Sequence, residues 1–336
     1  MVKGTVCCLV QQTVSIERVG SLRKNGINSL RRPPYCYPAV ESGAKCMMPL
    51  DSIPAIDRVL IVGAGWVGRQ VAARMAQHGV EIWLYDRHRT ICEQAVAWMH
   101  NLDDTSNQPA MPNGDSWQAR VRIADNLELE GIQLILENVP EQLSLKKRVL
   151  REISQQFPEP AIIASNSSYF TPSMLSRFVT SPSRFAHFHF HVPVQHESVA
   201  DIVGCPETDP LVLDQLAELS VRIGQPPMRL RHEHPGYVFN WLLQSLLRSS
   251  LELVALDVVD PQDVDRSWKA VTGMPIGPFG MMDQIGLDVI EQILSNARWA
   301  EPKAASIEQL IAVLQQPINR GDLGVKTQRG FYSYAK

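Results

Sequence analysis

The sequence lacks the features that mark several common protein classes. Its six cysteines form no C-x-x-C pair, and four of them lie within the first fifty residues, at positions 7, 8, 36 and 46. This pattern supports neither a zinc ribbon nor a redox dithiol, and it suits a reducing compartment. No apolar run reaches the roughly 18 residues that a membrane-spanning helix requires. We therefore expect a cytoplasmic protein with no membrane partner.

An excess of charge of one sign is also missing. The formal net charge is only −3, from 32 basic and 35 acidic residues. Because nucleic acids and anionic membrane surfaces bind basic faces, this balance argues against both as partners. The length of 336 residues, with 45% hydrophobic side chains, instead fits a globular protein of two domains.

The first fifty residues differ in composition from the rest. They carry seven basic residues but only Glu17 and Glu41 as acids, and they show no hydrophobic periodicity. Residues 1–52 are therefore predicted to be an extension outside the folded body. A basic, acid-poor leader is typical of an organelle transit peptide. The alternatives are a dispensable tail, or a chain that naturally begins at Met47 or Met48.

From residue 53 onward, short apolar runs alternate with segments of helical periodicity. Strands are expected at residues 58–62, 81–85, 133–136 and 161–164, with helices at 68–78 and 144–155. This alternation predicts an α/β domain over residues 53–230, with a parallel, Rossmann-type doubly wound sheet. After residue 230 the strand pattern ends, and helices are expected at 238–256, 261–270, 287–296 and 307–315. Residues 231–336 are therefore predicted to be an all-helical C-terminal domain.

A glycine-rich turn follows the first expected strand. Gly63, Gly65 and Gly68 fit G-x-G-x-x-G, the turn opens a helix, and Asp86 ends the next strand about twenty residues later. These glycines allow a tight turn, close approach of a pyrophosphate and close packing of the helix. Asp86 can accept both ribose hydroxyls and would repel a 2′-phosphate, so the motif predicts NAD rather than NADP. The alternative is a structural turn with a surface acid.

Three alternating histidines, His187, His189 and His191, form the most unusual local feature. In an extended strand all three would face one way. They could form a metal site, supply one catalytic histidine with two bystanders, or have no chemical role. Nearby carboxylates are sparse, with Glu197 and Asp201 as the candidates, and hydride transfer in a dinucleotide-binding fold needs no metal. We therefore predict a catalytic histidine and no metal.

Several segments, taken in order, resemble the 3-hydroxyacyl-CoA dehydrogenases. Besides the glycine turn and the histidine segment, they are L-I-L-E-N-V-P-E at 134–141, S-N-S-S at 165–168, P-G-Y-V-F-N at 235–240, the segment 277–288 and the segment 324–332. The similarity extends from residue 56 nearly to the end of the chain. It implies a two-domain NAD-dependent enzyme with its substrate between the domains, and a homodimer formed by the helical half.

The resemblance also implies individual roles. The family's H-F-F-N-P segment places its catalytic histidine at His189, and the acid that pairs with it twelve residues later at Asp201. By the same correspondence, the substrate contacts are Ser168 and Asn240, and the cofactor contacts after the fourth strand and near the C-terminus are Glu141, Lys146 and Lys326. His189 would take the hydroxyl proton as hydride leaves carbon, and its cation would return that proton in the reverse reaction.

Departures from the family pattern leave the substrate open. Val192 stands where the family usually has asparagine, and Asp201 replaces a longer glutamate. Residues 101–117 are short and acidic, where acyl-CoA enzymes carry lysines that contact the CoA phosphates, and an acidic loop suits a polyphosphate poorly. We expect reversible oxidation of a 3-hydroxyacyl substrate, with 3-hydroxyacyl-CoA first. The alternatives are a small or carrier-bound 3-hydroxy acid (carnitine- or gulonate-like) and a catalytically weakened NAD-binding protein.

Overall fold

The computed structural model describes residues 53–102, 116–157, 159–194, 198–296 and 305–334. The predicted extension 1–52, most of the acidic segment 101–117, and Glu197 lie outside the described residues. None of the helices in the described ranges is both long and apolar enough to span a membrane.

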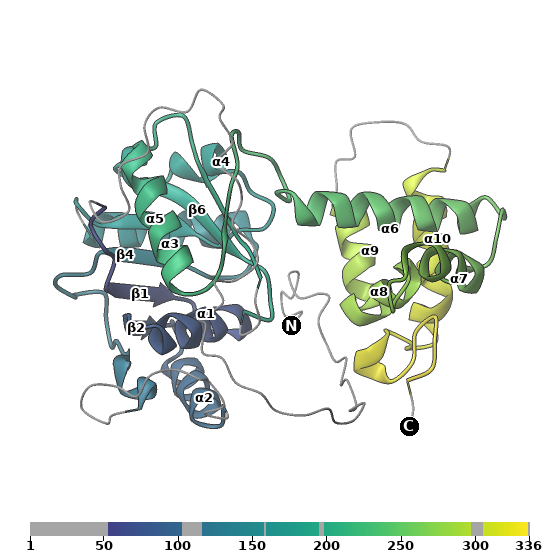
Figure 1. The fold of residues 1–336 in the computed structure, drawn as a ribbon, viewed down its shortest axis with the longest axis horizontal. Helices are drawn as coiled ribbons and strands as arrows, with labels where there is room; N and C mark the ends of the chain where they lie inside the picture. The colour runs from purple at the N-terminus through teal and green to yellow at the C-terminus, as the bar shows by residue number, and fades with distance from the viewer. Residues whose placement is uncertain (1–52, 103–115, 158, 195–197, 297–304, 335–336) are drawn as a thin grey trace, which may run out of the picture.

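An eight-stranded sheet forms the centre of the first domain (Figure 1). Its strands are β1 (Arg58–Val62), β2 (Glu81–Tyr85), β3 (Val121–Ile123), β4 (Leu134–Glu137), β5 (Ile162–Ser165), β6 (Phe185–Phe190), β7 (Ala200–Gly204) and β8 (Pro227–Arg229). They lie in the order β3-β2-β1-β4-β5-β6-β7-β8, and every neighbouring pair is parallel except β6 and β7. The chain leaves β1 toward β2 on one side and continues with β4 on the other, so the topological switch point lies between β1 and β4.

Helices cover both faces of this sheet because its central strands, such as β1 and β4, are apolar on both sides. In β1, Val59 and Ile61 face one core cluster, while Leu60 and Val62 face the other. The first cluster includes residues of α1 (Trp66–Gln77), α2 (Arg89–His100) and α5 (Pro210–Arg222). The second includes residues of α3 (Leu143–Gln156) and α4 (Pro172–Ser176). Single-turn 3-10 helices occur at η2 (Trp117–Arg120), η3 (Pro182–Arg184) and η4 (Val325–Thr327).

The second domain is helical and has its own core. Its helices are α6 (Phe239–Ala255), α7 (Pro261–Thr272), α8 (Pro278–Ile285), α9 (Leu287–Asn296) and α10 (Ile307–Asn319). Asp283, fully buried in α8, accepts hydrogen bonds from the backbone N–H groups of Phe331 and Tyr332 and from the Tyr334 hydroxyl. One carboxylate therefore joins the two C-terminal family-like segments, since Asp283 and Phe331 are 48 residues apart in the sequence.

The predicted fold class is confirmed, with local corrections. Strands 58–62 and 81–85 and helix 287–296 end where predicted. The sheet is not entirely parallel, because β7 returns beside β6 in the antiparallel direction. The strands β3, β7 and β8 and the helices α2 and α5 were not predicted; β3 and β8 are only three residues long.

Candidate active site

The predicted glycine turn crosses the carboxyl ends of the parallel strands. Gly63 has φ +99°, and a Cβ there would lie 2.8 Å from the backbone carbonyl of Asn138, so only glycine fits. Its N–H donates to the Tyr85 carbonyl at 2.8 Å, which attaches the turn to the end of β2. A Cβ on Gly68 would lie 2.0 Å from the Gly63 carbonyl oxygen, so α1 packs directly under the turn.

Gly65 meets a different constraint. A Cβ built on it would have no heavy atom within 4 Å, so the residue borders open space rather than packed protein. It is also the N-cap of α1, and the first turn of that helix contains no acidic residue. The positive end of the helix dipole is therefore uncompensated by the helix itself and suits a phosphate group.

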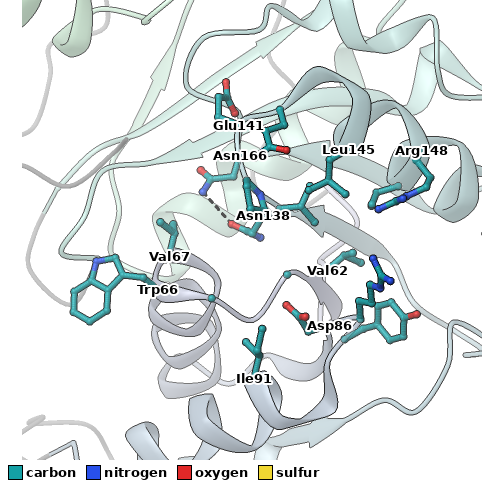
Figure 2. A pocket seen from close by; sticks show the side chains of 18 of the residues that line it. Val62, Trp66, Val67, Asp86, Ile91, Asn138, Glu141, Leu145, Arg148 and Asn166 are labelled. Carbon is teal, nitrogen blue, oxygen red and sulfur yellow. Dashed lines mark hydrogen bonds between the residues drawn. The ribbon is translucent and has the colours of Figure 1, made fainter. Parts of the chain in front are cut away.

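Asp86 follows β2 on the other side of this space (Figure 2). One carboxylate oxygen accepts the N–H of Ala64 at 3.2 Å, and the other accepts the N–H of His88 at 3.1 Å. These bonds hold the carboxylate beside the turn. Asp86 and the helix terminus thus lie together, as the predicted ribose and pyrophosphate contacts require.

The turn and Asp86 line a pocket of about 1530 Å³. Side chains at the carboxyl ends of four strands contribute to it, including Val62, Tyr85, Asn138 and Asn166, and the amide of Asn166 donates to Asn138 at 2.9 Å (Figure 2). The pocket extends to Ser168, and two residues of α9 also line it. Open α/β sheets bind ligands at this switch-point crevice.

Ser168 brings the pocket to a buried histidine and acid. His189 Nε2 lies 3.2 Å from Ser168 Oγ, and His189 Nδ1 lies 3.1 Å from Asp201 Oδ2. His189 and Asp201 are direct partners across β6 and β7, and both are almost completely buried. Burial by itself would raise the pKa of Asp201, but the hydrogen bonds from the two nearby histidines lower it below the usual value, so the group is a carboxylate.

This geometry determines which nitrogen of His189 carries the proton. A carboxylate only accepts hydrogen bonds, so Nδ1 must donate to Asp201. In the neutral ring Nε2 then holds a lone pair, and the Ser168 hydroxyl donates to it. The arrangement is that of a general base beside a site where a substrate hydroxyl can bind.

His191 also contacts the acid, with its Nε2 2.8 Å from the same oxygen of Asp201. The ring centroids of His189 and His191 are 4.8 Å apart. Potential ligand atoms of His189, His191 and Asp201 all lie within 4.8 Å of one another, which meets the distance requirement for a cation. In this arrangement Oδ2 of Asp201 accepts from both imidazole rings.

Two family models match the chain in succession. The model of the 3-hydroxyacyl-CoA dehydrogenase NAD binding domain matches residues 58–233, and the model of the C-terminal domain matches residues 236–334. The chain belongs to the 3-hydroxyacyl-CoA dehydrogenase family. The resemblance inferred from the order of the motifs is confirmed, and the protein is an NAD-dependent oxidoreductase that acts on CH–OH groups.

Relatives within this family differ in their substrates. The mitochondrial hydroxyacyl-coenzyme A dehydrogenase of Homo sapiens is 25% identical over 290 residues, which cover 83% of this chain and 91% of the relative. The 5-formyl-3-hydroxy-2-methylpyridine 4-carboxylate 5-dehydrogenase of Mesorhizobium japonicum is 26% identical over 284 residues, with coverage of 83% and 91%. A diketoreductase structure, described as performing dual catalysis of dicarbonyl compounds, has a TM-score of 0.76 at 31% identity and covers 84% of this chain and 100% of its own.

The residues of this chain fit the family's cofactor. Open space over Gly65, an α1 terminus without acidic residues and the Asp86 carboxylate are suited to the pyrophosphate and adenosine ribose of NAD. The assignment of individual contacts to Gly63, Gly65, Gly68 and Asp86 stays a prediction.

Glu141 and Lys146 belong to a buried charge network at the edge of the pocket. Glu141 accepts hydrogen bonds from the Ser167 hydroxyl and from the N–H of Tyr169, so it shapes the loop that carries Ser168. Lys146 is buried, and its ammonium contacts Glu141 at 3.3 Å and Glu137 at 2.9 Å. Burial alone would lower the pKa of Lys146, but these two carboxylates raise it above its usual value. Both residues support the loop, and their predicted contact with the cofactor is untested.

Glu137 had no assigned role in the sequence analysis. It is completely buried at the end of β4, where it accepts from Lys146, from the Ser165 hydroxyl at 2.6 Å and from the Val139 N–H at 2.7 Å. An acid at the end of a wholly apolar strand was the sequence signal for this role, because such a group is buried only when it is paired.

His187 and Tyr237 form a second network, and their pairing was not predicted from the sequence. Tyr237 donates its hydroxyl proton to the Ser167 carbonyl, so His187 Nδ1 must be the donor in its 2.9 Å contact with the Tyr237 oxygen. The Tyr237 ring also stacks on His189, with centroids 4.4 Å apart. Burial, with the charges of Lys146 and His189, lowers the pKa of His187 well below its usual value, so His187 is neutral.

The two remaining predicted residues lie in the helical domain. Asn240 is in the first turn of α6, four residues after Gly236, whose N–H donates to the Ser168 carbonyl at 3.2 Å. This bond brings the start of α6 to the serine, although the contact of Asn240 with substrate stays a prediction. Lys326 pairs with Asp288 at the start of α9. Its predicted cofactor contact is likewise untested.

Proposed function

We propose that this enzyme reversibly oxidises the hydroxyl group of a 3-hydroxyacyl substrate to the 3-keto form, with His189 as general base. The observation that carries the proposal is the Ser168–His189–Asp201 alignment at the end of the NAD pocket. In this alignment the Nε2 lone pair of His189 faces Ser168 and the pocket, while Nδ1 faces the buried Asp201 carboxylate. A surface histidine with no chemical role would not have this arrangement.

The chain's own residues supply the proton chemistry. The substrate hydroxyl would replace the Ser168 hydroxyl as donor to His189 Nε2. This nitrogen would then remove the proton of the substrate hydroxyl. Asp201 stabilises the resulting imidazolium through its bond to Nδ1. Ser168 and Asn240 would hold the oxygen of the reacting carbon. NAD, when bound, accepts the hydride from that carbon, and all steps reverse when His189 returns the proton to a carbonyl.

A thioester of coenzyme A is the substrate that family membership favours. A second candidate, a small or carrier-bound 3-hydroxy or dicarbonyl compound, is favoured by one specific comparison. The diketoreductase structure shares 31% identity with this chain and is covered along its whole length. The acidic composition of residues 101–117 also favours a substrate without CoA phosphates.

A panel of ketone substrates with NADH as reductant distinguishes the candidates. The panel compares acetoacetyl-CoA, acetoacetyl-pantetheine, acetoacetate, dehydrocarnitine and acetylacetone by kcat/KM. A rate with acetoacetyl-CoA at least tenfold above that with acetoacetyl-pantetheine supports recognition of CoA. Equal rates, or faster turnover of the small ketones, would assign the enzyme to the second class. Absence of NADH oxidation with every compound would contradict the proposed reaction and support a weakened NAD-binding protein.

We also propose a homodimer in the cytoplasm, with import through residues 1–52 as the alternative location. Several apolar side chains of the helical domain are exposed, among them Leu242 at 62%, Val258 at 64% and Val271 at 84%. Exposed apolar groups of this size favour burial against a second copy. Light scattering coupled to size-exclusion chromatography should give about twice the chain mass, and a monomer would contradict the proposal.

A further inference from the structure

The carboxylate that pairs with the proposed base accepts hydrogen bonds from two histidines. Asp201 Oδ2 accepts from His189 Nδ1 at 3.1 Å and from His191 Nε2 at 2.8 Å, so the bond to His191 is the shorter one. Asp201 is 1% exposed and the His191 side chain is 13% exposed, so water competes weakly for either bond. In the family's H-F-F-N-P pattern the position of His191 is a phenylalanine, which has no N–H to donate.

His191 is a neutral donor near pH 7. Its burial lowers its pKa and outweighs the opposing effect of the hydrogen bond with Asp201; a protonated His189 would lower it further. Among the described residues, the ionisable groups in contact with His191 are His189 on β6 and Asp201 on β7. His187 and Tyr237 lie beyond His189. Phe239 of α6, which carries no charge, also packs on His191, with the two ring centroids 5.4 Å apart.

Sharing one carboxylate has a direct consequence for the base. A carboxylate that already accepts a short hydrogen bond has less negative charge to offer a second donor. Protonation of His189 at Nε2 depends on stabilisation of the imidazolium by Asp201. A second donor on the same oxygen therefore opposes protonation of His189 and favours the neutral form that acts as base.

Resting on the proposed function, we propose that His191 is a positioning residue that shares the Asp201 carboxylate with His189 and thereby keeps the catalytic base unprotonated near neutral pH. His191 acts through Asp201 and contacts neither substrate nor cofactor in this assignment.

Two substitutions separate the hydrogen bond from the ring. His191→Phe keeps an aromatic ring but removes the donor, whereas His191→Gln keeps an amide N–H donor that cannot titrate. The readout that requires no substrate is the titration of His189, followed by the imidazole ¹⁵N shifts of histidine-labelled protein and assigned with His189→Gln. His100→Phe, which changes an exposed histidine at the end of α2, is the matched control.

We expect the His189 titration to move upward by about half to one pH unit in His191→Phe, and to stay near the wild-type position in His191→Gln and His100→Phe. The acid limb of the kcat/KM profile for alcohol oxidation should move in the same direction. Titration of His189 at the wild-type pH in a folded His191→Phe protein, with native circular dichroism and NADH binding, would overturn the inference. Equal shifts in the phenylalanine and glutamine variants would also overturn it, because the donor would then have no effect.

The two proposals fail separately. If no substrate is turned over while the His189 titration shifts as expected, the proposed reaction is wrong, and only the effect of His191 on the protonation of His189 stands. If turnover is found but the titration does not shift, the reaction stands and the role of His191 is wrong.

Discussion

At the scale of single residues, hydrogen-bond donors and acceptors determine the protonation of the site. The Asp201 carboxylate requires protons on the facing nitrogens of His189 and His191, and the Ser167 carbonyl requires the proton of Tyr237. The sequence could predict His189 and Asp201 because the family motif and a spacing of twelve residues identify them. It could not predict Tyr237, whose contacts depend on how the start of α6 packs against β6.

Asp86→Ala is a test of cofactor selection at this scale. Removing the carboxylate should remove its bonds to the ribose hydroxyls and its repulsion of a 2′-phosphate. We expect the ratio of kcat/KM with NADH to that with NADPH to fall at least tenfold. Glu93→Ala, at an exposed acid of α2, is the control and should keep the wild-type ratio. An unchanged ratio in Asp86→Ala would place the selectivity elsewhere.

At the scale of secondary-structure elements, the turn between β1 and α1 places a glycine with a structural role beside one with a predicted binding role. Gly68 lets α1 pack against the Gly63 carbonyl, while Gly65 faces open space. The motif and its position after a strand made this turn predictable. Pairing of β6 with β7 was not predictable, because the antiparallel return depends on contacts between strands rather than on local apolar periodicity.

Alanine substitutions should separate these two glycine roles. Gly68→Ala places a methyl group against a backbone carbonyl that cannot move aside, so we expect the free energy of unfolding to fall by about 3 kcal/mol. Gly65→Ala should change that free energy by no more than about 1 kcal/mol, yet weaken NADH binding by about tenfold. Urea denaturation and NADH fluorescence titration measure the two effects. Equal loss of stability in both variants would contradict the assignment.

At the scale of the whole molecule, buried polar groups join segments that are distant in sequence. Asp283 attaches the C-terminal segment to α8, and the His187–Tyr237 pair attaches the start of α6 to the sheet. The order of the motifs allowed the two-domain fold to be predicted. These attachments were not predictable, because a polar residue within a motif does not reveal which distant backbone it contacts.

The neutral buried His187 makes stability depend on pH. Its folded-state pKa is lowered far below the usual 6.5, so below that pH the unfolded chain binds a proton that the folded chain does not. Stability should therefore fall as pH decreases through 6.5. The lowered pKa values of Asp201 and Glu141 add a further loss only below about pH 4.

Between pH 7 and 5.5 we expect His187 to contribute about 1 kcal/mol to this fall in the free energy of unfolding. Urea denaturation of wild type and of His187→Gln at both pH values measures it. The decrease in the free energy of unfolding between the two pH values should be about 1 kcal/mol smaller in His187→Gln than in wild type. The exposed-site control His100→Gln should behave as wild type. An equal fall in His187→Gln would contradict a neutral His187.

A chelator provides a further check on the whole enzyme. Both imidazoles direct an N–H group to Asp201 Oδ2 in the proposed arrangement, and we predict that proton transfer by His189 needs no cation. We expect dialysis against EDTA to leave kcat/KM unchanged within twofold. Loss of activity that returns with zinc would instead favour the metalloenzyme interpretation of His189, His191 and Asp201.

The most direct measurement for the central claim is the turnover of His189→Ala with the best substrate of the panel. Without the imidazole no group accepts the hydroxyl proton, so kcat should fall by about 10²–10⁴-fold. The dissociation constant of NADH should stay within about threefold of wild type, because His189 lies behind Ser168 rather than in the lining of the cofactor pocket. A His189→Ala enzyme with turnover within tenfold of wild type would show that His189 is not the base.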